Sequence, residues 1–223
     1  DKSADTFLRQ EPGHADIWAI KGISLFRIGR YDEAVAALDR SLEMNPLVAD
    51  AWLHKGLALN AMQKYTDAVS AFNKVTELSP GNTPANYHRG IAFSHLHKYR
   101  DAILDFDSTL SFEPENSDAL YLKGVACIRL SRYEDALTSF NQALLKKGEH
   151  PASFYFRGIA LTKLGRHKEA IESFEQALRL DPGCSPAAFQ GGIAYASLGR
   201  YTEAVSAYDR ALKINPMNGD AYF

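Results

Sequence analysis

Cysteine is scarce in this sequence, and its two cysteines do not suggest a disulfide framework. Cys127 lies in an apolar stretch, and Cys184 directly follows a Pro-Gly turn. Secreted domains that depend on disulfides carry several cysteines at regular spacings. We therefore expect a reducing, cytoplasmic setting.

The chain also lacks long apolar runs and any strong excess of charge. No segment approaches the ~18 consecutive apolar residues of a membrane-spanning helix. The formal net charge is −2, whereas nucleic-acid binders usually carry a basic balance. Neither a membrane nor a nucleic acid is therefore expected as a partner.

Motifs for catalysis are missing as well. The sequence has no phosphate loop, no glycine-rich nucleotide turn and no Ser-His-Asp set. The adjacent carboxylates Glu134 and Asp135 are better explained by the start of a helix, where negative charge interacts favourably with the helix dipole, than by acid–base catalysis. We expect no enzymatic activity and no cofactor in these residues.

What the sequence does have is a strict internal period. Six glycines recur every 34 residues, at Gly22, Gly56, Gly90, Gly124, Gly158 and Gly192. An alanine follows each glycine after 12 residues, at Ala34, Ala68, Ala102, Ala136, Ala170 and Ala204. A fixed period of this length is typical of a solenoid, in which each unit packs only on its neighbours.

Residues 15–48 illustrate one unit. Apolar and small residues at i, i+4 and i+7 from Trp18 form one face of a helix, and Gly29 allows the left-handed conformation that ends it. A second helix begins near Asp32 and ends before Pro46, because proline cannot continue the hydrogen-bond ladder. Each unit is thus predicted to be a pair of antiparallel helices, called helix A and helix B below.

The glycine column needs a physical reason, since glycine inside a helix costs roughly 1 kcal/mol relative to alanine. We expect each glycine and its alanine to let the backbones of helices A and B approach closely. Helix B has a polar column, whereas helix A carries a second apolar stripe. Helix A is therefore predicted to line the concave wall of the array, and helix B the convex wall.

These residues resemble tetratricopeptide repeats. The resemblance rests on the glycine and alanine columns and on further columns of Trp, Tyr, Phe and Pro, which include Trp18, Tyr31, Phe72 and Pro46. It implies an all-α fold, a right-handed α-α superhelix with six complete repeats and partial repeats at both ends. The units are expected within one array spanning residues 1–223, at 15–48, 49–82, 83–116, 117–150, 151–184 and 185–218, with partial repeats at 1–14 and 219–223.

The array shows no polar capping helix after Asn218, although arrays normally finish with one. We therefore expect the chain to be part of a longer array that lacks its native N-terminus. The uncovered apolar end after Leu212 and Ile214 would also allow self-association.

The resemblance implies a concave groove that binds peptides or protein segments, but two known uses of such grooves do not match. The clamp for chaperone C-terminal carboxylates requires Lys, Asn and Arg, where the first alignment offers Ala19, His54 and His88. Other alignments fit no better. The asparagine ladder for extended peptides is replaced by Ile20, His54, His88, Leu122, Phe156 and Gln190.

What remains is a groove with aromatic, histidine and basic side chains. The candidate binding residues are Phe26, His54, Tyr87, His88, Tyr121, Arg129, Tyr155, Phe156, Lys163 and Phe189. Because aromatic and Arg side chains often anchor interfaces, we expect the ligand to be an apolar or aromatic segment with some acidic residues. The alternative is that the tyrosines pack against the next helix A and expose only their hydroxyls.

Two basic columns and one acidic column have structural interpretations. We expect the column Lys21, Lys55, Arg89, Lys123 and Arg157 to pair with acids at the start of helix B, such as Asp67 and Asp101. A second column, which includes Arg30 and Arg132, is expected to neutralise helix C-termini. His54, His88 and His95 share one side, but no Cys or carboxylate joins them, so no metal is expected.

The sequence thus predicts a non-catalytic scaffold for protein interactions. The alternative is the substrate-recruiting arm of an enzyme whose catalytic domain lies outside these residues. The groove does not identify the partner, because one fold hosts many functions.

Overall fold

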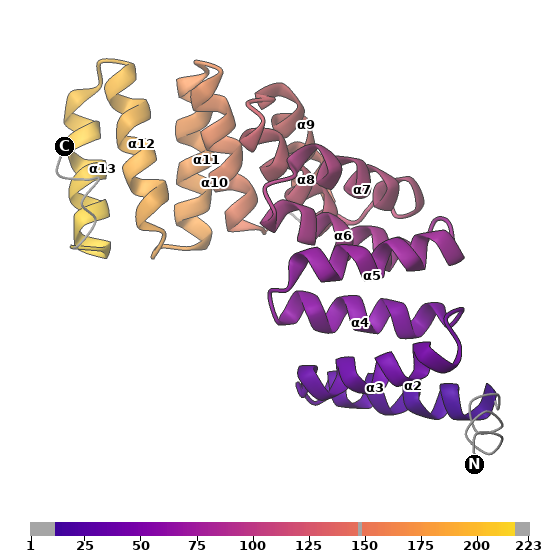
Figure 1. Cartoon of the computed structure of the whole chain (residues 1–223). Helices are drawn as coiled ribbons and strands as arrows, with labels where there is room; N and C mark the ends of the chain where they lie inside the picture. The colour runs from indigo at the N-terminus through magenta and orange to yellow at the C-terminus, as the bar shows by residue number, and fades with distance from the viewer. Residues whose placement is uncertain (1–11, 147–148, 217–223) are drawn as a thin grey trace, which may run out of the picture. The chain divides into compact units, whose positions relative to one another are not determined.

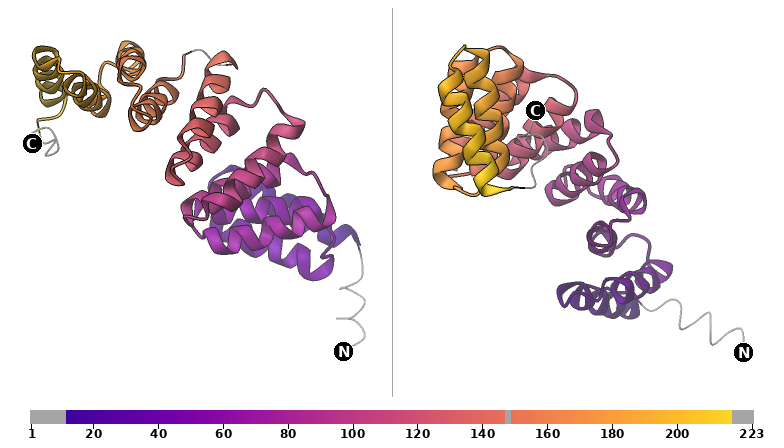
Figure 2. Two further views of the ribbon diagram at one scale, coloured as in Figure 1. Left: turned by 90° about the horizontal axis from the view of Figure 1, so that it is seen from above. Right: turned by 90° about the vertical axis from the view of Figure 1, so that its left-hand side faces the viewer.

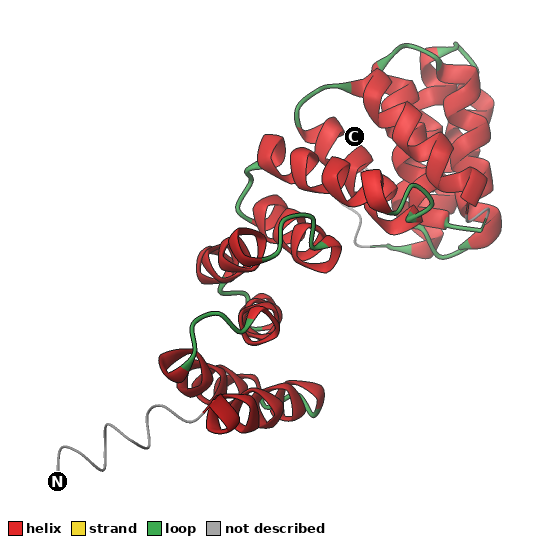
Figure 3. Cartoon of the chain, turned by 90° about the vertical axis from the view of Figure 1, so that its right-hand side faces the viewer, coloured by secondary structure: helices red, strands yellow, loops and turns green. Residues whose placement is uncertain are grey.

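The computed structural model describes residues 12–146 and 149–216, and these residues form helices joined by short turns (Figure 3). No strand occurs within those ranges. The helices follow one another as antiparallel pairs (Figure 1): α2 (Pro12–Arg27) with α3 (Tyr31–Met44), α4 (Ala49–Ala61) with α5 (Tyr65–Leu78), α6 (Thr83–His95) with α7 (Tyr99–Phe112), α8 (Ser117–Arg129) with α9 (Tyr133–Lys146), α10 (Pro151–Lys163) with α11 (His167–Leu180), and α12 (Ser185–Ser197) with α13 (Tyr201–Ile214).

The chain divides into two compact units, the first ending at Glu113 and the second beginning at Pro114. Within each unit, helix A packs on its own helix B, and that helix B packs on the next helix A. Figure 2 shows this stacking for α10, α11, α12 and α13 in the second unit. The predicted all-α fold, a solenoid of helix pairs, is confirmed. The expected partial repeats at 1–14 and 219–223 lie largely outside the described residues.

Helices A approach one another inside each unit. In the first unit α2 contacts α4 and α4 contacts α6, and in the second α8 contacts α10 and α10 contacts α12. Comparable contacts do not join successive helices B in the described part of the chain. Helix A therefore lies on the inner side of the curvature within each unit.

The turn between helix A and helix B has one recurring backbone conformation. Its left-handed residue is glycine in three described repeats, with φ of 79° at Gly29, and a non-glycine in three others, with φ of 60° at Gln63. The next amide then bonds back to helix A, as from Arg30 N to the Leu25 carbonyl at 3.0 Å. This bond satisfies a carbonyl that the helix end would leave open.

The glycine column is explained mainly by a large side chain of helix B, which is an aromatic ring in five repeats and Leu38 in the first. A Cβ built on Gly124 would lie 2.6 Å from Cε1 of Phe140, and one on Gly158 would lie 2.6 Å from Cε1 of Phe174. Both phenyl rings are fully buried. Glycine is therefore needed because this helix B side chain occupies the space that a side chain on helix A would fill.

The predicted ion-pair partners are wrong for Lys55 and Arg89. The predicted acids Glu33 and Glu169 do have pKa values lowered by hydrogen bonds from Arg30 and Arg166 and, to a lesser extent, by the charges of Lys21 and Arg157. Lys55 Nζ pairs with Asp39 of the preceding helix B at 2.6 Å, and Arg89 pairs with Asp105 in the interior of its own helix B. Acids at the start of helix B bind the second basic column instead, as in Arg132–Asp135 at 2.7 Å. The spacing of three residues explains why Arg132 rather than a helix A cation binds Asp135, since residues three apart are neighbours on a helix turn.

Both cysteines are free thiols, Cys127 buried and Cys184 half-buried. Burial raises the pKa of the Cys184 thiol.

Candidate peptide-binding face

In the first unit, four predicted site residues form aromatic contacts on the helix A side. Phe26 meets the edge of the His54 ring at a centroid distance of 6.0 Å. Tyr87 meets the edge of His88 at 5.1 Å, and His88 stacks on the buried Phe72 of the preceding helix B at 6.4 Å. The structure thus brings Phe26 together with His54, and Tyr87 together with His88.

The two histidines differ in their surroundings. His54 Nδ1 lies 2.8 Å from the Asp50 carbonyl oxygen. Because a carbonyl oxygen only accepts hydrogen bonds, Nδ1 must carry a proton, and Nε2 is the ring nitrogen left for another polar contact. Burial lowers the pKa of His88, which favours the neutral imidazole at neutral pH. The backbone carbonyl of His88 accepts a hydrogen bond from the Asn60 side chain at 2.9 Å, which joins α4 to α6.

In the second unit, the predicted residues form a longer run of rings. Tyr155 meets the edge of Phe156 at 5.0 Å, and Phe156 lies 5.9 Å from Tyr121 of the preceding helix A. Tyr121 also meets the edge of His150 at 4.9 Å, a contact that the sequence did not suggest. Phe189 on α12 contacts Tyr208 at 5.7 Å. The helix A side therefore presents half-buried rings along successive helices.

These rings also contribute to the packing of each repeat. Tyr87 contacts Phe106 of its own helix B at 6.3 Å, and Tyr155 contacts Phe174 at 6.2 Å. The predicted alternative placed the tyrosines against the next helix A, and Tyr121 does contact Phe156 there. Tyr87 and Tyr155 instead contact rings on helix B of the same repeat. A ring in this column thus has one side in the core and leaves part of its surface for other contacts.

The tyrosine hydroxyls are held in the neutral form. Burial raises the pKa of Tyr121, and burial together with the nearby Cys184 raises that of Tyr155. Each hydroxyl therefore stays protonated at physiological pH and can donate one hydrogen bond to a ligand.

The two basic site residues lie apart from the rings. Arg129 and Lys163 stand in the last turns of α8 and α10 and are exposed. Each follows its helix's tyrosine by eight residues, a rise of about 12 Å along the axis. The candidate face therefore has an aromatic half and, further along each helix, a basic edge.

The sequence matches two tetratricopeptide repeat models, one over residues 2–41 and 21–83 and the other over residues 161–223. Together these matches cover more than half of the chain. The chain belongs to the tetratricopeptide repeat family. A model of the anaphase-promoting complex, cyclosome, subunit 3, matches residues 95–177 of this tetratricopeptide chain. No curated protein matches it significantly.

Solved tetratricopeptide structures share the fold. YrrB, described as having an unusual peptide-binding site, is 24% identical, with 83% of this chain and 96% of YrrB covered and a TM-score of 0.74. MamA from Desulfovibrio magneticus RS-1 is 22% identical, with 77% of this chain and 97% of MamA covered and a TM-score of 0.72. A tetratricopeptide repeat protein from Parabacteroides merdae is 17% identical, with 94% of this chain and 83% of that protein covered and a TM-score of 0.76.

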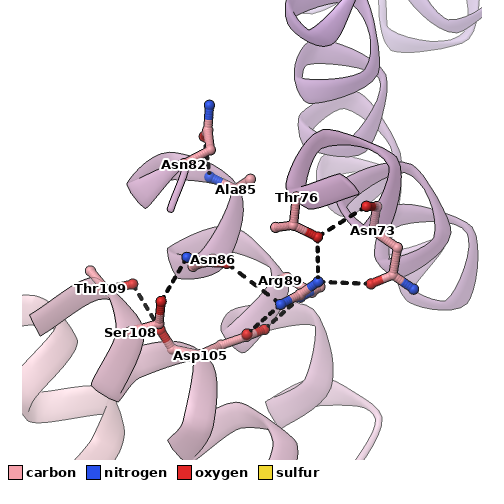
Figure 4. A network of polar contacts seen from close by, with 9 residues as sticks. All are labelled: Asn73, Thr76, Asn82, Ala85, Asn86, Arg89, Asp105, Ser108 and Thr109. Carbon is pink, nitrogen blue, oxygen red and sulfur yellow. Dashed lines mark hydrogen bonds and ion pairs between the residues drawn. The ribbon is translucent and has the colours of Figure 1, made fainter. Parts of the chain in front are cut away.

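A buried polar cluster in the first unit distinguishes one tetratricopeptide repeat from the others (Figure 4). Arg89 on α6 bonds to Asp105 on α7 and, through Nη1, to the side-chain oxygens of Asn73 at 2.9 Å and Thr76 at 3.0 Å. Asn86 donates to Ser108 Oγ at 2.9 Å. Asn86 and Asp105 are both buried, with 4% and 5% of their surfaces exposed.

The sequence did contain a signal for this cluster. Asn86 stands in the column of Trp18 and Trp52, and Asp105 in the column that holds Ala37 and Ala71. Two polar residues at core positions of the same repeat favour a mutual contact, because buried polar groups require partners.

The described histidines do not gather into a metal site. His95 stacks on Tyr65, with centroids 4.3 Å apart and nearly parallel planes, rather than joining His54 and His88. Within residues 12–146 and 149–216, no three His, Cys, Asp or Glu side chains are placed to hold one ion. None of the helices in those ranges has the length and apolar character needed to span a membrane.

Proposed function

We propose that this tetratricopeptide array is a non-catalytic scaffold that binds a peptide or protein segment along its helix A face. The observation that supports this most directly is the run of half-buried rings Tyr121, Phe156 and Tyr155 in the second unit. Partly exposed aromatic rings supported from beneath by a rigid core are typical anchors for a ligand, because ordering them costs little entropy.

The basic edge defines the second feature of the ligand. Arg129 and Lys163 are exposed, about 12 Å along the helices from the tyrosines. A segment that places an apolar or aromatic residue on the rings and acidic residues about four positions away would satisfy both parts, since extended chain advances ~3.3 Å per residue. Peptide binding by YrrB, a protein of the same fold, is consistent with this use of the fold.

Selection of random peptides displayed on phage against the full chain tests this function. We expect enriched peptides to combine an aromatic residue with acidic residues. In fluorescence anisotropy, Arg129→Glu with Lys163→Glu should weaken an enriched peptide at least about tenfold, as loss of an anchor does.

The matched control is Lys168→Glu with Arg179→Glu, which reverses two exposed charges on α11, a helix B. This control should bind like the wild type. Equal affinity of both double variants, or enrichment of peptides without aromatic residues, would contradict the proposal.

A further inference from the structure

The sixth repeat lacks the cation that the earlier repeats carry on helix A. Gly191 occupies the column of Lys21, Lys55, Arg89, Lys123 and Arg157. Its backbone is ordinary helix rather than left-handed, and a Cβ built on it would meet Phe174 Cβ at 3.7 Å, a normal contact. Packing and backbone conformation therefore do not require glycine at this position, in contrast to Gly192 next to it.

The first unit shows what the cation does in this column. Lys55 on α4 reaches Asp39 on the preceding helix B, with Nζ and Oδ1 2.6 Å apart, and its Nζ lies 5.0 Å from the centre of the Trp52 ring. Arg89 on α6 reaches Asn73, the equivalent residue one repeat later, at 2.9 Å. The cation thus bonds to a polar side chain across a cleft between successive helices B.

The second unit has an equivalent cleft that receives no cation from helix A. Its volume is about 260 Å³, and it lies among α11, α12 and α13. Ile171 and Leu178 supply apolar walls, and Glu175, Tyr195 and Gly191 line it beside them. Glu175 stands in the column of Asp39 and Asn73. The acceptor is therefore retained, whereas its donor has been replaced by glycine.

The charges around the cleft leave Glu175 without a counter-ion among the described residues. Its carboxylate accepts a hydrogen bond from the neutral Tyr195 hydroxyl at 2.6 Å. The other acid in the lining, Glu203, is paired with Arg200 at 2.8 Å. Arg210 also lines the cleft. Its equivalent in the first unit, Lys74, lines the cleft that holds Lys55 and is paired with Glu77 at 2.7 Å, whereas Lys213 stands in the column of Glu77.

We propose that this cleft binds a lysine or arginine side chain from a partner protein. The partner's cation would occupy the place that Lys55 takes in the first unit, with its alkyl stem against Ile171 and Leu178 and its charge on Glu175. Arg200 covers one face of the Tyr195 ring at 4.7 Å, so the stem would border the remainder of the ring, and the Tyr195 hydroxyl would orient the carboxylate. The cleft is lined by α11, α12 and α13, and its lining includes none of the candidate residues of the helix A face proposed above.

The probe for this site is the peptide acetyl-Ala-Ala-Arg-Ala-Ala-amide, compared with the same peptide carrying Gln in place of Arg. Titration into the isotopically labelled full chain is followed by amide NMR. The Arg peptide should shift the signals of Gly191, Gly192 and Tyr195, and the Gln peptide should not. Glu175→Gln should weaken the Arg peptide about fivefold, which corresponds to the upper range for exposed ion pairs.

Gly191→Lys gives an independent test, because it supplies the cation from within the chain. This variant should fold normally and should no longer bind the Arg peptide. Glu172→Gln is the matched control, since it removes an exposed acid of α11 outside the cleft. Binding that persists in Gly191→Lys, or shifts that are equal for the Arg and Gln peptides, would overturn the proposal.

Discussion

Arg89 on α6 holds Asp105 on α7 through two parallel hydrogen bonds, from Nε to Oδ2 at 2.8 Å and from Nη2 to Oδ1 at 2.6 Å. Burial raises the pKa of Asp105, and the guanidinium of Arg89 opposes that rise. The Asp105 carboxylate can therefore occupy a core position only because Arg89 pairs with its charge and donates hydrogen bonds to it.

Replacing Arg89 by Met should therefore destabilise the chain in a pH-dependent way. For a carboxyl group whose folded-state pKa is raised, the stabilising contribution is complete below its usual pKa of 3.8 and is lost as the pH rises through the folded-state value. Arg89→Met removes the group that lowers this pKa. We expect a loss of roughly 3 kcal/mol at pH 7 and a smaller loss at pH 4, measured by urea unfolding.

The control for this prediction is the double variant Arg89→Met with Asp105→Ala. Alanine is the residue found at the equivalent positions Ala37 and Ala71, both buried. Because no unpaired charge remains, the double variant should recover most of the stability at pH 7. An equal loss for Arg89→Met at both pH values would show that packing rather than charge dominates.

Gly124→Val should destabilise the second unit strongly. A Cβ on Gly124 would lie 2.6 Å from Cε1 of Phe140, and Phe140 is 0% exposed, so the ring has nowhere to move. We expect a loss of roughly 1–3 kcal/mol from overpacking. Thermal unfolding measures it, and an unchanged melting temperature would contradict the packing described here.

Gly191→Ala should have the opposite effect on stability. The added methyl group meets Phe174 Cβ at an ordinary 3.7 Å, and the backbone is helical. Alanine should therefore raise the free energy of unfolding by up to about 1 kcal/mol through its helix propensity. The same urea experiment checks this, with Gly158→Ala as the destabilising counterpart, since its Cβ would lie 2.6 Å from the buried Phe174 ring.

Tyr195 should titrate late and should report on Glu175. Burial, followed by the hydrogen bond to Glu175, raises the pKa of Tyr195 to about 12 from the usual 10.0. Its contribution to stability is therefore complete below pH 10 and is lost as the pH rises to about 12. Glu175→Gln should move the pKa back towards 10.0, as followed by the NMR signal of the phenol carbon. A pKa that stays near 12 in Glu175→Gln would leave burial as its sole cause.

Much of the fold could be predicted from the sequence because it depends on local rules. The helix pairs follow from apolar spacing, and the turn at Gly29 follows from the need for a left-handed residue. Turns at Gln63 and Ser131 adopt the same conformation without glycine. The repeat pattern around them, rather than their own preference, indicated where the helix would end.

Contacts between repeats were predicted less well. The 34-residue period shows which residues occupy equivalent positions, but it does not show which neighbouring side chain each of them is long enough to contact. Lys55 was expected to pair with an acid at the start of a helix B, yet it reaches Asp39 in the preceding repeat. For the candidate face, the sequence predicted Tyr121, Tyr155 and Phe156, which the structure brings together, but missed the contact of His150 with Tyr121.

By itself, the sequence determined the helix pairs, their order and the glycine column. The helix pairs follow from apolar spacing and turn residues repeated every 34 residues, and the glycine column is visible directly in that period. The tertiary structure alone decided which helix B side chain fills the space beside each glycine of the column, which acid meets Arg89, and that the cleft at Gly191 retains Glu175 without its cation. These depend on how far side chains extend between neighbouring helices, and that reach is set only when the helices are packed.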